Sequence, residues 1–208
     1  MVRHRAHRTL ENAMRREGFR RIAGTDEVGR GCLAGPVVAA VVVLDPARHI
    51  AGLADSKLLT PAARERLFAV IASCADAWAV GSASPDEIDQ LNIHRASLEA
   101  MRRAVLALDP APDMVLVDAF RIPDLAVPQR AVVHGDRCCA AIAAASIMAK
   151  VTRDREMRAL HAADSRYGFD QHKGYATALH LAAVARYGYS SLHRRSFRPA
   201  SLFGRIEP

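Results

Sequence analysis

Carboxylates placed around predicted strands are the side chains of this sequence best suited to chemistry. The four are Asp26, Glu27, Asp118 and Asp136. A strand is predicted over residues 19–25, and the first two acids follow it. The third ends the apolar stretch 114–117, and the fourth precedes a predicted helix over about 137–162. The ends of strands and the loops after them are where α/β folds place their sites.

Converging carboxylates imply bound cations, because negative groups repel one another unless positive charge lies between them. Oxygen ligands without His or Cys indicate Mg²⁺ or Mn²⁺ rather than Zn²⁺. Two such ions about 4 Å apart can activate a water and stabilise the leaving oxygen in phosphodiester cleavage. Spacing along the chain does not itself bring the acids together. Each has an alternative as a solvated surface residue or, for Asp136, as a helix N-cap.

A glycine-rich segment, Gly29, Arg30 and Gly31, follows two of these acids. Glycine lets backbone N–H and C=O groups approach a ligand closely. Such a contact can sense a ribose 2′-hydroxyl, which is both donor and acceptor and distinguishes RNA from DNA. The alternative is an ordinary turn.

Two further segments combine aromatic and basic side chains. Residues 167–175 interleave Tyr and Phe with Lys and His, a mixture that can stack on a sugar or base while a cation holds phosphate. The alternative is a loop whose aromatics fill the core, and we favour it for Phe169. Residues 193–197 form a basic cluster, which a solvated face explains equally well.

The composition favours a globular protein with a polyanionic partner. The 208 residues are 50% hydrophobic and 25% charged, which is enough apolar material for a core. Lys and Arg exceed Asp and Glu by 29 to 22, a formal charge of +7, and cations near phosphates release condensed counterions. The four cysteines form no CxxC pair and fit buried thiols in a reducing compartment. Without an apolar h-region or a run of about 18 apolar residues, we expect a cytoplasmic protein without membrane association.

The remaining patterns predict an α/β fold. The apolar, β-branched run 36–44 is typical of a strand covered on both faces. Helices are predicted to begin after N-caps at Thr60, Ser84 and Asn92, the second with the spacing of a capping box. Further predicted elements are strands at 77–82 and 131–133, a helix at about 176–186 and a basic, helical arm at 3–17. We expect a single domain over residues 1–208, whose helical C-terminal extension covers about 165–208 and contributes to substrate binding.

Many short motifs occur in a specific order along the chain. The first are GTDEVGRG at 24–31 and AGPV at 34–37. Those that follow lie at 55–58, 117–118, 135–136, 144–154, 172–175 and 193–197. In this order the motifs resemble those of the ribonuclease HII family, and the resemblance covers about Ile22 to Phe197.

The resemblance implies an RNase H-like fold, a mixed central sheet flanked by helices. It also implies a site with two divalent ions, Mg²⁺ or Mn²⁺, held by the four acids. Asp26 would contact both ions, Glu27 and Asp118 would hold one each or share, and Asp136 would position the ion that activates the attacking water. Products in this family carry a 5′-phosphate and a 3′-hydroxyl.

The implied substrates are RNA–DNA hybrids, cut in the RNA strand, and duplex DNA that contains embedded ribonucleotides. Gly29, Arg30 and Gly31 would read the 2′-hydroxyl of the ribonucleotide 5′ to the RNA–DNA junction. Tyr175 would pack on the neighbouring deoxyribose, so that one ribonucleotide suffices as a target. Lys57 and Lys150 would contact phosphates. A monomer is the expected state.

Three alternatives remain. A ribonuclease HIII-like enzyme cuts hybrids but handles single ribonucleotides poorly; Arg30 and the roughly 20 residues before the first predicted strand argue against it. A non-catalytic hybrid-binding module would have lost at least one of the acids, and all four are present. A metal phosphatase or another nuclease of the same broad fold would be separated by substrate tests.

Two departures from the family pattern lie near the proposed site. Cys32 stands where Pro is frequent, and we hypothesise that it makes the enzyme sensitive to oxidation. His134 stands where Lys is common, and we hypothesise that it alters the pH or metal preference. Neither departure removes a carboxylate.

Overall fold

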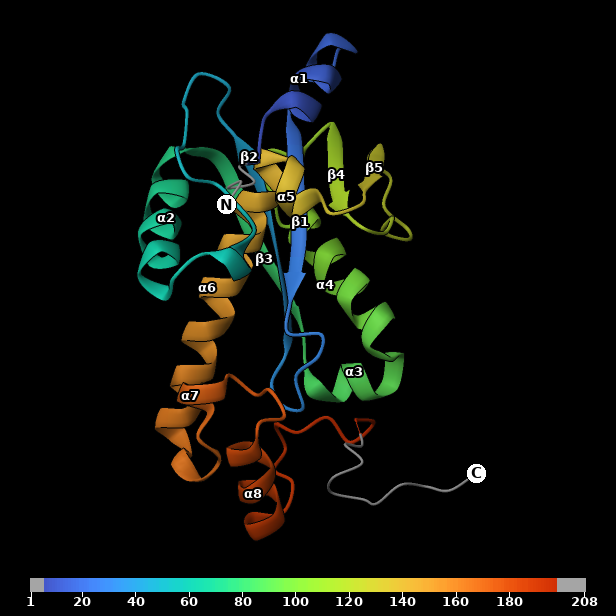
Figure 1. The fold of residues 1–208 in the computed structure, drawn as a ribbon. Coiled ribbons are helices and arrows are strands. Elements are labelled where there is room, and N and C mark those ends of the chain that lie inside the picture. The colour runs from blue at the N-terminus through green and yellow to red at the C-terminus, as the bar shows by residue number, and fades with distance from the viewer. Residues whose placement is uncertain (1–5, 198–208) are drawn as a thin grey trace.

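A mixed β-sheet forms the centre of the computed structural model, which describes residues 6–197 (Figure 1). Within this range the sheet has five strands in the order β3-β2-β1-β4-β5. The strands are β1 (Ile22–Val28), β2 (Val37–Leu44), β3 (Ala75–Ala83), β4 (Met114–Asp118) and β5 (Gln129–Val132). The first three are antiparallel neighbours, whereas β4 runs parallel to both β1 and β5. This arrangement confirms the predicted mixed sheet.

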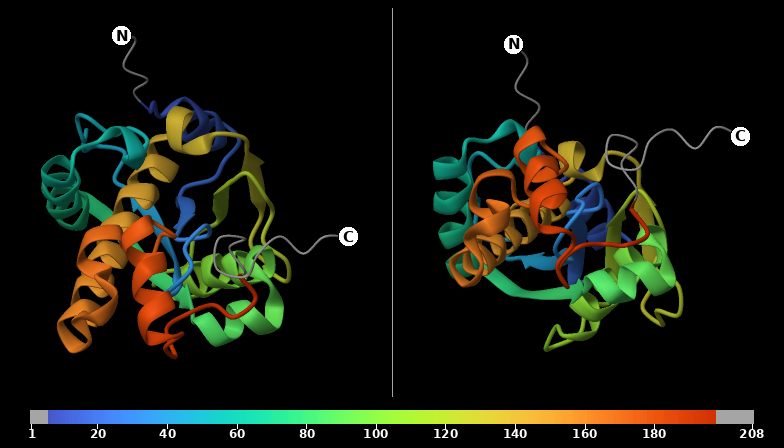
Figure 2. Two further views of the ribbon diagram at one scale, coloured as in Figure 1. Left: turned by 60° about the horizontal axis from the view of Figure 1, so that its bottom comes forward. Right: turned by 90° about the horizontal axis from the view of Figure 1, so that it is seen from below.

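Helices cover both faces of the sheet (Figures 1 and 2). They are α1 (Thr9–Arg16), α2 (Pro61–Cys74), α3 (Pro85–Leu91), α4 (Ile93–Leu106), α5 (Gly135–Cys138), α6 (Ala140–Ala163), α7 (Phe169–His172) and α8 (Ala178–Tyr187). Apolar residues of α1, α2 and α6 share one core with Ile22 and Leu116, whereas those of α3 and α4 share another with Ala23 and Val117. Because side chains alternate along a strand, even-numbered residues of β1 and β4 face α6 and odd-numbered residues face α4.

Local signals placed three helix starts correctly. Thr60 accepts a hydrogen bond from the Ala63 amide at the start of α2. Ser84 forms the predicted capping box at α3, and Asn92 caps α4. The strand β2 is buried along all of its length, as its continuous apolar run predicted.

Two predicted boundaries were wrong, both because of contacts with distant segments. The first strand extends through Asp26 and Glu27 instead of ending before them, since these residues pair with Ala40 and Ala39 of β2. The predicted long helix is divided into α5 and α6 by Cys139, which is extended. At this break the Ala140 amide donates to the carbonyl of His7, so the N-terminal segment interrupts the helix.

The C-terminal extension is helical only in part. Its helical parts are a 3-10 turn (Ser165–Tyr167), α7 and α8, and in Figure 1 α8 lies below the sheet whereas α7 lies beside the lower end of α6. Their apolar side chains form a third core with Leu33, Ala34 and Met157. Residues 188–197 contain no helix, and the predicted features at 1–5 and 198–208 lie outside the described residues. Within residues 6–197, no helix is long and apolar enough to cross a membrane.

Candidate active site

Asp26 and Asp118 lie side by side at one edge of the sheet. Thr25 of β1 pairs with Val117 of β4, and the acids are the next residues on these parallel strands. Both have even numbers and therefore face α6. In agreement with this, the side chain of Ser146 of α6 lies close enough to the Asp26 carboxylate to act on its pKa.

Negative charge is concentrated at this edge. Burial raises the pKa of Asp26 well above its usual value, and the charges of Glu27 and Asp118 raise it further. The pKa of Asp118 is also raised, by burial and by Glu27, although the Gly135 amide donates to its Oδ1 at 2.8 Å. Carboxylates that raise one another's pKa in this way form a site that favours a bound cation.

Glu27 lies at the same edge but is turned toward a different partner. Its charge raises the pKa of both Asp26 and Asp118, and its Oε1 accepts a hydrogen bond from Arg30 at 2.9 Å. In the part of the chain that the structure describes, no group of three or more His, Cys, Asp or Glu side chains is arranged to hold a metal ion. The fit to a divalent ion therefore rests on the donor chemistry, which is carboxylate oxygen throughout.

Asp136 lies near a further carboxylate, Asp55, for which no role was predicted from the sequence. Asp136 lies in α5, and its pKa is raised by burial and then by the charges of Asp55 and Asp118. Asp55 is buried, caps the Lys57 amide at 2.9 Å, and lies 3.6 Å from the Arg137 guanidinium. The motif at 55–58 was the signal that could have indicated Asp55, but a role was predicted only for its lysine, Lys57.

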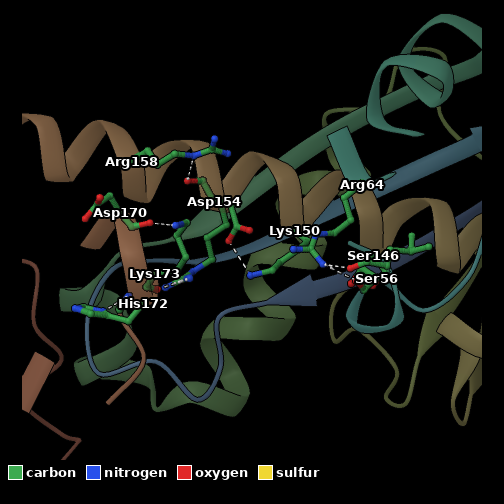
Figure 3. Close-up of polar contacts among 12 residues, drawn as sticks. Ser56, Arg64, Ser146, Lys150, Asp154, Arg158, Asp170, His172 and Lys173 are labelled. Atoms are coloured by element: carbon green, nitrogen blue, oxygen red, sulfur yellow. Dashed lines mark hydrogen bonds and ion pairs between the residues drawn. The ribbon is translucent and has the colours of Figure 1, made fainter. Parts of the chain in front are cut away.

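The two predicted phosphate-binding lysines differ in their surroundings. Lys57 is exposed, and its charge lowers the pKa of both Asp118 and Asp136, which places it at the acidic edge. Lys150 points along α6 to Asp154, with Nζ at 2.7 Å from Oδ1 (Figure 3). It lines a groove of about 770 Å³ that also contains Tyr175. Lys150 is thus paired with an acid in this structure and does not contact the four-acid edge.

Two buried arginines donate hydrogen bonds to backbone carbonyls in and just after the glycine-rich turn. Arg194 donates to the carbonyls of Arg30 and Gly35. Arg153 donates to the carbonyls of Ala34, Pro36 and Lys173. Both guanidinium groups are fully buried, and the acceptors named above are backbone carbonyls rather than carboxylates.

The alternative of a solvated face for residues 193–197 is therefore wrong for two of the three basic residues in this cluster. Arg194 is 0% and His193 is 2% exposed, whereas the third basic residue, Arg195, is exposed. The role of Arg153 and Arg194 was not predicted from the sequence, because all of their carbonyl partners except Lys173 lie more than 100 residues away along the chain. For Phe169 the favoured interpretation is confirmed, since it is fully buried in the third core.

The turn that carries Tyr175 packs directly against the glycine-rich turn. The amides of Leu33 and Ala34 both donate to the carbonyl of Gly174, at 2.8 and 3.3 Å, and Cys32 forms an isolated bridge with Tyr175. The Tyr175 side chain is 42% exposed and available to a ligand, whereas Cys32 is fully buried. A buried thiol lacks the access that oxidation requires, so the structure does not favour the hypothesis of oxidation sensitivity at Cys32.

Comparisons with known proteins agree with this arrangement. Among solved structures, the ribonuclease H2 from Pyrococcus horikoshii OT3 superimposes with a TM-score of 0.71 at 29% identity, covering 86% of this chain and 94% of that one. The ribonuclease HII in a PCNA complex from Archaeoglobus fulgidus gives 0.72 at 27% identity, with 86% and 96% covered. The fold is thus the RNase H-like fold.

Sequence comparison defines the family more narrowly. The family model described as Ribonuclease HII matches residues 23–200. A ribonuclease HII from Azoarcus sp. (strain BH72) is 58% identical over 181 residues, 87% of this chain and 89% of the relative. The chain belongs to the ribonuclease HII family and is a ribonuclease H.

Proposed function

We propose that this ribonuclease hydrolyses the RNA strand of RNA–DNA hybrids and cleaves 5′ to single ribonucleotides embedded in duplex DNA. The observation that carries the proposal is the acidic edge around Asp26, joined through Glu27 and Arg30 to the glycine-rich turn that packs against Tyr175. One surface thereby combines donors for cations with backbone groups suited to a ribose. In the same proposal the enzyme is a monomer, is located in the cytoplasm, and acts in ribonucleotide excision repair and DNA replication.

In this proposal Asp26, Glu27, Asp118 and Asp136 hold two divalent cations, Mg²⁺ or Mn²⁺. When bound, the cations supply an activated water and stabilise the leaving 3′ oxygen. The protein contributes the positions of its carboxylates. Asp118 is oriented by the Gly135 amide and Asp26 by the Glu27 amide, so that neither has to be ordered at the moment of reaction.

Arg30 has a second role in the proposal. Its ion pair with Glu27 at 2.9 Å connects the cation site to the recognition turn. The backbone of Gly29 and Gly31 would contact the ribose 2′-hydroxyl, and Tyr175 would pack on the deoxyribose that follows. Lys57, beside Asp118 and Asp136, would contact the phosphate at the cut, and Lys150 a phosphate further along the groove.

A substrate panel tests the proposal most directly. We expect Mg²⁺-dependent cleavage of a duplex that contains one ribonucleotide, with the cut on the 5′ side of that residue and a 5′-phosphate on the product. A long hybrid should also be cut, whereas plain DNA, single-stranded RNA and free phosphoesters should not. Cleavage of the hybrid alone would support a ribonuclease HIII-like specificity, and hydrolysis of free phosphoesters would support a phosphatase.

Replacing Tyr175 by alanine should reduce cleavage of the single-ribonucleotide duplex by about tenfold or more, because stacking contacts of this kind contribute about 1–3 kcal/mol. Long hybrids offer many equivalent cleavage positions and should lose less than about threefold. The measurement is kcat/KM on both substrates. Equal losses would exclude a role of Tyr175 in reading the sugar.

A further inference from the structure

Three buried histidines form a cluster next to the backbone of Tyr175 and have no part in the proposed chemistry. His172, His180 and His193 are 8%, 0% and 2% exposed. The first two rings are stacked with centroids 4.4 Å apart, and Nε2 of His180 lies 3.0 Å from Nε2 of His193. Phe169 packs edge-on against the rings of His172 and His180.

The hydrogen-bond partners define which nitrogen carries the proton in each ring. His180 Nδ1 lies 2.9 Å from the Tyr175 carbonyl, which can only accept, so Nδ1 is the protonated nitrogen and Nε2 is an acceptor. His193 Nδ1 accepts from the Ser190 amide at 3.0 Å, so its Nε2–H donates to His180. His172 donates from Nε2 to the Tyr167 carbonyl and accepts the Gly174 amide at Nδ1. All three rings are therefore neutral, with one tautomer each.

This series of hydrogen bonds ends at the carbonyl of Tyr175, the residue whose side chain is proposed to contact the sugar. Ser190 fixes the tautomer of His193, His193 fixes that of His180, and His180 donates to the Tyr175 carbonyl. The adjacent Gly174 is held by His172 on one side and by Leu33 and Ala34 on the other. In agreement with the neutral assignment, burial lowers the pKa of both His180 and His193 to about 4.

We propose that His180 is a positioning residue for substrate reading, which fixes the Tyr175 peptide and hence the orientation of its ring through the Nδ1–H bond to the Tyr175 carbonyl. This inference rests on the proposed role of Tyr175. The Nδ1 side of His180 is required for this role, because only that side of the ring reaches the Tyr175 carbonyl. Loss of this bond should reduce sugar reading without affecting the acidic edge, since the histidine cluster and the four acids have no contact in the described residues.

Two substitutions separate the two sides of the imidazole. In His180→Asn the amide nitrogen occupies the place of Nδ1 and can still donate to the Tyr175 carbonyl. In His180→Gln the longer side chain carries its amide to the place of Nε2, so the contact with His193 is retained and the bond to Tyr175 is lost. Both are neutral, polar and of similar size, and each serves as the control for the other.

The expected result is a selective loss in one variant. On the single-ribonucleotide duplex, His180→Gln should lower kcat/KM by about tenfold, the effect of losing one buried hydrogen bond that orients a contact. His180→Asn should stay within about threefold of the unmodified enzyme. On a long hybrid both should be within about threefold. Equal losses in the two variants, or equal losses on the two substrates, would overturn the inference.

Tyr175→Ala distinguishes the failure of this inference from that of the proposed function. If Tyr175→Ala leaves single-ribonucleotide cleavage unchanged, the proposed role of Tyr175 is wrong. If Tyr175→Ala lowers it and His180→Gln does not, only the inference about His180 is wrong. The double variant should be no worse than Tyr175→Ala alone, because both changes remove the same contact.

A second position keeps the test valid if His180→Gln does not fold. His193→Asn keeps an acceptor for the Ser190 amide but removes the donor to His180 Nε2, so the Nδ1–H form of His180 loses its second hydrogen bond. We expect a smaller loss, about threefold, again confined to the single-ribonucleotide substrate. A uniform loss on both substrates would show that the histidines serve the fold alone and would overturn the inference.

Discussion

Replacing Asp26 by asparagine is expected to lower kcat by at least about 1000-fold, equivalent to roughly 4 kcal/mol of activation free energy, while raising the Tm of the metal-free protein by several degrees. The activity falls because a proposed cation ligand is lost. The stability rises because the folded protein no longer holds a buried negative charge beside Glu27 and Asp118. Asparagine keeps the Oδ1 acceptor for the Glu27 amide, so the local geometry is preserved.

Thermal unfolding in EDTA and with Mg²⁺ checks this prediction. Mg²⁺ should raise the Tm of the unmodified protein, because it binds the folded state, and should raise that of Asp26→Asn much less. The pH dependence follows from the raised pKa of Asp26. Its charged form destabilises the fold above the folded-state pKa, and this destabilisation is relieved as the pH falls through that value. The metal-free enzyme should therefore gain stability relative to Asp26→Asn on mild acidification.

Asp118→Asn is the matched variant. It should lose activity to a similar extent and keep hybrid binding, because its Oδ1 still accepts the Gly135 amide. Its gain in stability should be smaller, since Asp118 is less buried than Asp26 and Lys57 lies near it. Near-normal turnover in either variant would show that the acid is not a cation ligand.

Signals encoded within a few residues were read correctly from the sequence. The caps at Thr60, Ser84 and Asn92 depend on amides two or three positions away, and the burial of β2 follows from its own apolar run. The order of short motifs gave the family, which the family model and the relatives confirm, and the roles of the four acids stay a prediction. These features could be predicted because the residues that determine them are adjacent in the sequence.

Features that depend on distant segments could not be predicted in the same way. Nothing near Asp26 and Glu27 signals that β1 continues through them, since the pairing of these two residues comes from β2. Arg153 and Arg194 read as ordinary basic residues, yet both are fully buried against carbonyls of residues 30–36. Charged groups are seldom buried, so sequence patterns assign such arginines to the surface. Their importance is visible only once the two turns are brought together.

Gly29→Ala is expected to destabilise the protein by about 2–4 kcal/mol and to lower single-ribonucleotide cleavage by at least about 100-fold. Gly29 has a φ of +94°, which side chains rarely adopt, and an added Cβ would lie 2.3 Å from Nε of Arg153. Arg153 cannot move aside without losing its bonds to the carbonyls of Ala34, Pro36 and Lys173. Both recognition turns should therefore shift.

Gly31→Ala separates this structural effect from substrate contact. No atom lies within 4 Å of a Cβ added at Gly31, and its φ is outside the left-handed region, so its free energy of unfolding should be equal to or slightly above that of the unmodified protein. If the Gly31 backbone approaches the ribose, cleavage should still fall severely in this stable variant. Denaturant unfolding and kcat/KM are measured for both variants. Full activity in Gly31→Ala would exclude a contact between the Gly31 backbone and the ribose. Wild-type stability in Gly29→Ala would show that Arg153 does not support the turn, because the added methyl group would then fit where the buried guanidinium leaves no room.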